Sequence, residues 1–169
     1  MASRITNPYV AMPVLLFQEP PGDGRLSLRL VACYRFRPGP PRPLPLLLWR
    51  VCAGFPSPAD DYVEEALDLN DLLVRNPPAT FMMRVRGRSM EPGGIDDGDL
   101  LVIDRSLEAR TGDVVIAYLN GELAVKRIAT IGGRLALVAD NDAFPPIEIT
   151  EAMDFDVWGV VTHVIHSVR

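Results

Sequence analysis

The alternation of apolar and polar positions after residue 79 predicts a series of short β-strands. Runs rich in Val, Ile, Leu and Met are separated by turn-forming glycines, as expected for strands joined by tight connections. The runs are residues 80–86, 100–104, 113–119, 122–128, 134–139, 148–149 and 157–166. Short strands with little helix between them predict a mostly β domain, folded over on itself into a compact body.

Residues 60–73 carry a different pattern. Apolar side chains recur there near helical spacing, and acidic residues at the start suit the positive end of a helix. We expect one or two short helical turns packed on the β body. Pro77–Pro78 ends this segment.

The first fifty residues differ in composition from the remainder. They contain seven arginines against two acids, about +5, whereas the rest, with 10 basic and 20 acidic residues, is about −10. Nine of the 16 prolines lie here, and the cluster at 38–43 excludes a helix interior. We expect an extended, loosely held Pro/Arg-rich arm, with residues 26–36 as its one β-like run. Its positive charge suits nucleic acid or an acidic partner, although such runs are more often simply solvated.

No apolar run approaches the ~20 residues that cross a bilayer, and residues 12–17 make a poor secretory signal. We therefore expect a cytoplasmic protein without a membrane partner. Cys33 and Cys52 are too few for a disulfide framework or a zinc site. His163 and His166 lack Cys or carboxylate partners at ligand spacing along the chain, so neither a metal site nor a cofactor is predicted.

Lys126 is the single lysine among 17 cationic residues. Arginine stays protonated, whereas a lysine buried among apolar groups can lose its proton and act as a base. Asn120–Gly121 predicts a hairpin turn, and regular alternation after it places Lys126 on one face with Ala124 and Ile128. The alternative is a surface lysine on an exposed strand face.

Ser89 follows the apolar run 80–86 and precedes a Pro-Gly-Gly turn. A serine hydroxyl is a poor nucleophile until a base removes its proton, so Lys126 and Ser89 form a candidate catalytic pair. For an isolated serine, capping of the turn is the commoner role. The pairing with Lys126 favours the catalytic one.

Several motifs together resemble the LexA/UmuD family of self-cleaving serine-lysine peptidases, over roughly residues 45–169. These are Gly87-Arg88-Ser89-Met90-Glu91-Pro92, residues 94–101, Ala124-Val125-Lys126-Arg127 thirty-seven positions after Ser89, residues 53–64 and 68–70, and the closing run 157–164. The resemblance implies a mostly β peptidase domain with Ser89 and Lys126 as its catalytic dyad. It also implies an oxyanion hole from backbone N–H groups near Ser89, for which we select those of Ser89 and Met90.

The resemblance also implies cleavage of the chain by itself at Ala53–Gly54, thirty-five residues before Ser89. Cleavage one bond earlier, at Cys52–Ala53, is the alternative. Residues 1–53 would then be the arm that is removed and 54–169 the mature peptidase and accessory domain.

For function, the resemblance implies an SOS-type accessory of error-prone DNA repair. RecA filaments on single-stranded DNA activate cleavage in this family, and the shortened product forms a homodimer and joins a UmuC-like translesion polymerase. One alternative is a LexA-like repressor fragment, although no helix-turn-helix pattern precedes Arg50. Others are a non-catalytic interaction module and a signal-peptidase-like enzyme, which would need an anchoring apolar helix.

Overall fold

The computed structural model describes residues 29–35, 39–42, 44–47 and 63–169, and within them the chain is mostly β, as predicted. Cys52 and the predicted scissile pair Ala53–Gly54 lie outside the described residues. The strands are β1 (Arg29–Arg35), β2 (Leu44–Leu47), β3 (Val63–Leu67), β4 (Thr80–Arg86), β5 (Leu100–Asp104), β6 (Val114–Leu119), β7 (Glu122–Ile131), β8 (Arg134–Val138), β9 (Ile147–Glu148) and β10 (Phe155–Ile165). Over the same described ranges, one helix, α1 (Leu69–Leu73), and two 3-10 turns, η1 (Pro77–Ala79) and η2 (Glu91–Gly93), complete the elements.

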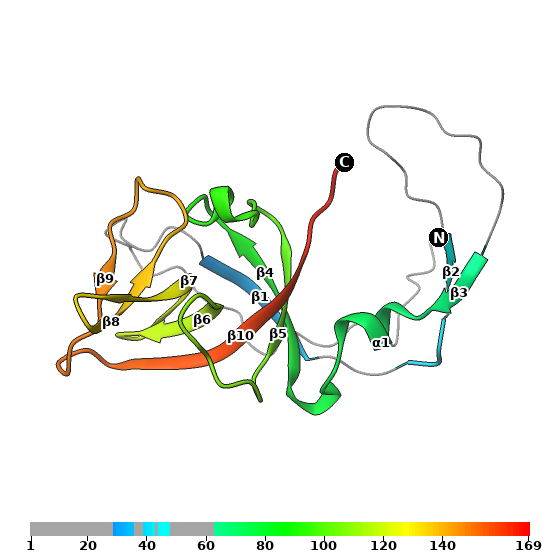
Figure 1. The fold of residues 1–169 in the computed structure, drawn as a ribbon, viewed down its shortest axis with the longest axis horizontal. Helices are drawn as coiled ribbons and strands as arrows, with labels where there is room; N and C mark the ends of the chain where they lie inside the picture. The colour runs from blue at the N-terminus through cyan, green and yellow to red at the C-terminus, as the bar shows by residue number, and fades with distance from the viewer. Residues whose placement is uncertain (1–28, 36–38, 43, 48–62) are drawn as a thin grey trace, which may run out of the picture.

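The main sheet is antiparallel, in the order β1-β4-β5-β10-β6-β7-β8-β9. An additional pairing of β1 with β7 closes a ring through β1, β4, β5, β10, β6 and β7, from which β8 and β9 extend (Figure 1). The long strand β10 pairs with β6 through its first half and with β5 through its second. Register shifts within β10 let it bend between them, because bulges increase local twist.

The predicted hairpin at Asn120–Gly121 is confirmed as the β6–β7 connection. Both residues adopt positive φ, 49° and 93°, as a two-residue hairpin of this type requires. Alternate residues of the hairpin enter two apolar clusters. Val125 and Ile116 belong to one, with Met83, Met90 and Leu101, and Val115 and Ile128 belong to the other, with Leu137 and Val160.

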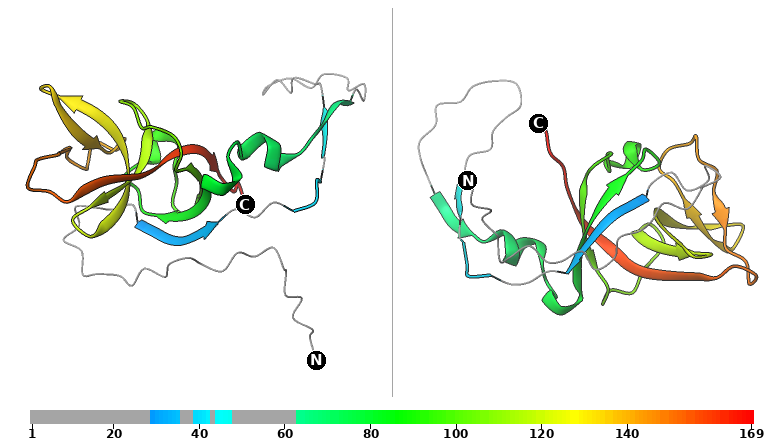
Figure 2. Two further views of the ribbon diagram at one scale, coloured as in Figure 1. Left: turned by 90° about the horizontal axis from the view of Figure 1, so that it is seen from below. Right: turned by 180° about the vertical axis from the view of Figure 1, so that it is seen from behind.

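Part of the N-terminal arm is integral to the sheet rather than loosely held. Strand β1, inside the predicted run 26–36, pairs antiparallel with β4 over Arg29–Arg35 and meets β7 at Ala124. The buried side chain of Cys33 joins the first apolar cluster. Strand β2 pairs with β3 in a separate two-stranded ribbon, which lies beside the main β body with α1 between them (Figures 1 and 2).

The helical prediction for residues 60–73 is correct only at its end. Val63–Leu67 forms strand β3 on β2, and the helix is confined to Leu69–Leu73. Asp68 begins this helix by accepting a hydrogen bond from the Asn70 N–H at 2.7 Å. Pairing between distant segments therefore overrides the local spacing before Asp68.

Candidate active site

Ser89 lies in the turn between β4 and η2, in a conformation held from several sides. The Met90 carbonyl accepts hydrogen bonds from Gly93 N–H at 3.0 Å and Ile95 N–H at 3.2 Å. The side chain of Met90 is fully buried in the first apolar cluster and anchors the turn to the core. Upstream, Gly87 N–H donates to the Asp97 carboxylate at 2.8 Å. The turn therefore presents Ser89 from a fixed backbone.

Lys126 lies in the middle of β7, opposite Val115 of β6, and its side chain is only 2% exposed. Ala124 and Ile128 are buried as well, as the predicted strand alternation requires, and the surface-lysine alternative is wrong. Burial lowers the pKa of Lys126 below its ordinary value, and the nearby negative charge of Asp140 opposes part of that effect. The neutral amine is thus favoured more strongly than in water.

The loop between β8 and β9 connects the Ser89 turn to the strand that carries Lys126. Asn141 N–H donates to the Ser89 carbonyl at 3.1 Å, and Asn141 Nδ2 donates to the Arg88 carbonyl at 3.0 Å. Farther along the same loop, the Phe144 ring centroid lies 5.6 Å from Lys126 Nζ. The two predicted catalytic residues therefore contact the same short segment.

Ser89 Oγ is the buried side-chain polar atom that lacks a hydrogen-bond partner within the described part of the chain. No direct hydrogen bond joins it to Lys126 Nζ in the described structure, so the dyad stays a prediction. A buried hydroxyl without a partner is costly to a fold and is a common mark of a functional group. Catalytic hydrogen bonds also often tighten only when substrate is bound.

The backbone N–H groups of Ser89 and Met90, predicted as the oxyanion hole, donate no hydrogen bond to another of the residues described here. Most buried N–H groups are paired within a fold, so two adjacent donors at Ser89 and Met90 with no partner in the described part of the chain suit the binding of an anion.

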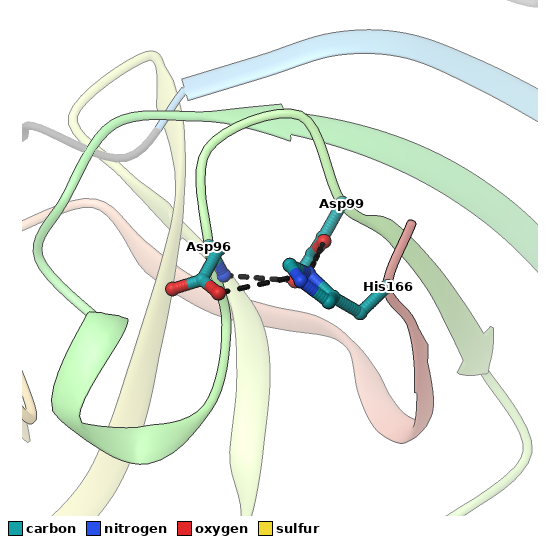
Figure 3. Close-up of side chains that lie close together, drawn as sticks. All are labelled: Asp96, Asp99 and His166. Atoms are coloured by element: carbon teal, nitrogen blue, oxygen red, sulfur yellow. Dashed lines mark hydrogen bonds and ion pairs between the residues drawn. The ribbon is translucent and has the colours of Figure 1, made fainter. Parts of the chain in front are cut away.

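A second group of titratable side chains lies at the turn that follows η2 (Figure 3). His166, directly after β10, contacts Asp99 at 2.8 Å and Asp96 at 3.6 Å through Nδ1. The expectation that the histidines lack carboxylate partners is therefore wrong for His166, because strands β10 and β5 bring distant residues together. The hydrogen bond to Asp99 raises the pKa of His166 above its ordinary value.

One ligand atom each from Asp96, Asp99 and His166 lies within 4.8 Å of the others, a separation that one metal ion can span. Asp99 already accepts from His166 and, at 2.8 Å, from Asp96 N–H. This arrangement is a closed hydrogen-bonded group as it stands, and an acidic cluster alone does not define a metal centre.

The sequence did not identify Asp140, Asn141, Phe144 or the Asp99–His166 pair as parts of these groups. Residues 140–146 have the composition of a loop, without periodicity that assigns a direction to any side chain. No signal in the sequence singles out Asn141.

Comparison with known proteins places these features in a family. Residues 45–162 match the family model described as Peptidase S24-like. That match includes Ser89, Lys126 and the predicted scissile pair, and it begins after β1.

Individual relatives agree with the family match. Protein ImpA of Shigella flexneri is 46% identical over 125 residues, which cover 74% of this chain and 85% of that protein. Protein MucA of Escherichia coli is 46% identical over 121 residues, covering 71% and 82%. A LexA repressor of Ectopseudomonas mendocina is 41% identical over 120 residues, covering 70% of this chain and 58% of the repressor. Among the described residues, no helix is long and apolar enough to cross a membrane.

Proposed function

Because the chain belongs to the Peptidase S24-like family, of the LexA/UmuD type, we propose that it is a self-cleaving serine peptidase that uses Ser89 and Lys126. The observation that carries the proposal is the burial of Lys126 among apolar side chains. Burial lowers the pKa of a lysine in that setting, so the neutral amine that acts as a base is favoured. Ser89 Oγ, which has no hydrogen-bond partner among the described residues, is the hydroxyl for it to activate, and the Ser89 carbonyl bonds the β8–β9 loop that also approaches Lys126.

The reaction follows acyl-transfer chemistry. Neutral Lys126 takes the proton of Ser89 as Oγ attacks the carbonyl carbon of Ala53, and the N–H groups of Ser89 and Met90 stabilise the oxyanion. Protonated Lys126 then gives its proton to the departing amine of Gly54. Water hydrolyses the acyl-enzyme, with Lys126 again acting as the base, and Ser89 is regenerated.

The substrate is the chain itself, at Ala53–Gly54, with Cys52–Ala53 as the neighbouring alternative. A tethered substrate has a high effective concentration, so an unregulated site would destroy its precursor at once. Docking of the cleavage segment is therefore the controlled step, populated rarely without an activator.

The family resemblance supports a role in SOS-type error-prone DNA repair. The proposed activator is a RecA filament on single-stranded DNA, and the product of residues 54–169 would dimerise and join a UmuC-like translesion polymerase. The cleavage reaction itself needs no cofactor, because its nucleophile and base both come from the chain.

The test is incubation of the purified chain at alkaline pH, where lysine loses its proton without help. Mass spectrometry should detect a fragment that begins at Gly54. Ser89→Ala and Lys126→Ala should each abolish it. Ser167→Ala, an exposed serine near the C-terminus, is the matched control and should cleave normally.

Persistence of the fragment at the wild-type rate in either dyad variant would rule out this mechanism. The same holds if the wild-type chain never cleaves, even with an activated RecA filament. In that case a regulatory module without catalytic activity becomes the better description.

A further inference from the structure

We propose that Asp140 is a positioning residue for the dyad, which joins the Ser89 turn to strand β7 and supplies the negative charge that Lys126 experiences. The inference rests on the proposed function of Ser89 and Lys126, and it adds a residue that acts through them. Three sets of contacts made by the β8–β9 loop support this role.

The first contact fixes Asp140 itself. Its carboxylate accepts two hydrogen bonds from Arg127, from Nε at 2.8 Å and from Nη2 at 2.5 Å. Arg127 Nη1 also donates to the Gly112 carbonyl at 2.7 Å. Bidentate pairing with a planar guanidinium gives a defined geometry, so the carboxylate is held beside β7 rather than free to rotate.

The second contact lies at the turn that carries Ser89. A Cβ atom added at Gly93 would meet Asp140 Oδ2 at 1.8 Å, so η2 packs directly on this carboxylate. Only a residue without a side chain fits at position 93 without a shift. The adjacent Asn141 adds its two hydrogen bonds to the carbonyls of Arg88 and Ser89.

The third contact is electrostatic. Three elements surround Lys126. Its neighbour on β7 is Arg127, and the apolar Val115 of β6 lies opposite it. The β8–β9 loop contributes Asp140 and the Phe144 ring. Among the described residues, Asp140 is the ionisable group whose charge acts on the pKa of Lys126, and it raises that pKa against the larger effect of burial. Asp140 therefore pairs with Arg127 and also attracts protonated Lys126.

This arrangement has a consequence that a purely structural ion pair would not have. Removing the charge of Asp140 takes away the attraction that opposes the effect of burial on Lys126, so the neutral amine is favoured further. In Asp140→Asn, the cleavage rate should therefore reach half of its maximum at a lower pH than in the parent chain. A structural role alone would lower the rate at every pH without moving the profile.

The single lysine of this chain permits a direct measurement. In an inactive Ser89→Ala background, lysine labelled with ¹³C at Cε gives one side-chain resonance, and its chemical shift against pH reports protonation of Lys126. We expect the midpoint of Asp140→Asn to lie below that of the parent. Asp142→Asn, an exposed acid on the same loop, is the matched control and should keep the parent midpoint.

Two further variants separate charge from position. Gly93→Ala pushes the turn off the carboxylate but keeps the charge, and Asn141→Ala removes the ties to Arg88 and Ser89. In a Ser89-containing chain, both should reduce the cleavage rate across the pH range with a smaller shift of the profile than Asp140→Asn. Thermal melts of every variant confirm that each is folded, and the lysine resonance is measured only below the melting temperature.

The inference is overturned if the Lys126 midpoint in Asp140→Asn is unchanged or rises. It is also overturned if Gly93→Ala and Asn141→Ala both cleave at the parent rate. The titration needs no cleavage, so it fails or succeeds independently of the dyad. Conversely, if Lys126→Ala cleaves as fast as the parent chain, the proposed Ser89–Lys126 dyad is refuted, whatever the titration of Lys126 shows.

Discussion

Lys126 and His166 are two titratable cations of one chain placed in opposite surroundings. Lys126 is 2% exposed, lies opposite Val115 and near the Phe144 ring, and burial lowers its pKa. The His166 side chain is 48% exposed, and its contact with Asp99 raises its pKa. The β body therefore favours a neutral base at one site and a protonated group at the other.

The pKa shifts of Lys126 and His166 differ in direction partly because their neighbouring carboxylates have different hydrogen-bond partners. Asp99 is buried, with 3% of its side chain exposed, and it hydrogen-bonds His166 directly. Asp140 gives both carboxylate oxygens to Arg127, so it opposes the desolvation of Lys126 without outweighing it. A nearby acid therefore stabilises a cation fully only when it is not already neutralised by another partner.

The largest effect is expected from replacing the buried amine. Lys126→Met keeps an unbranched side chain of similar length, so it should abolish cleavage yet stabilise the fold by about 1–3 kcal/mol, because a polar group no longer has to be buried. Lys126→Arg should destabilise the fold instead, because the guanidinium stays charged. Urea unfolding at neutral pH measures both. A Met variant less stable than the Arg variant would contradict the burial argument.

A smaller effect is expected in the pH dependence of stability. Because the pKa of folded Lys126 lies below its ordinary value near 10.5, the unfolded chain binds more protons between the two values. Stability should therefore rise with pH through this window, and the rise should be absent without the lysine. Comparing urea midpoints of Ser89→Ala with Ser89→Ala/Lys126→Met isolates this contribution, since the raised pKa of Tyr118 is common to both. Parallel curves would contradict it.

Some features of the β strands were predictable from local patterns in the sequence, and others were not. Alternation left the burial of Lys126 open, and the fold decides it. The face that Lys126 shares with Ala124 and Ile128 was predictable, because a hairpin turn at Asn120–Gly121 and alternation along one strand need only local information. Strands β4 and β5 have the predicted bounds for the same reason. Val63–Leu67 was misassigned because five residues near helical spacing also fit a strand once β2 pairs with them.

The surroundings that set each pKa were not predictable in this way. Asp140 reaches Lys126 from an aperiodic loop, and Asp99 reaches His166 across sixty-seven positions through the pairing of β5 with β10. Neither contact leaves a periodic trace in the sequence. The direction of the Lys126 shift followed from burial alone, whereas that of His166 required the tertiary fold.

The smallest effect is expected at His166, because its side chain is half exposed and its ion pairs are screened by solvent. Its folded pKa is raised, so its contribution to stability is complete below the ordinary value of about 6.5 and is lost as pH rises through the folded value. His166→Gln should remove this dependence and loosen the contact of the C-terminal segment with Asp99.

Melts between pH 5 and 9 measure the pH dependence of stability at His166, and hydrogen exchange of residues 160–169 measures the loosening of the C-terminal segment. His163→Gln is the control for losing a neighbouring histidine. High salt should weaken the wild-type dependence, since part of it is attraction to Asp96 at 3.6 Å. A His166→Gln variant that keeps the full pH dependence would assign it to another group.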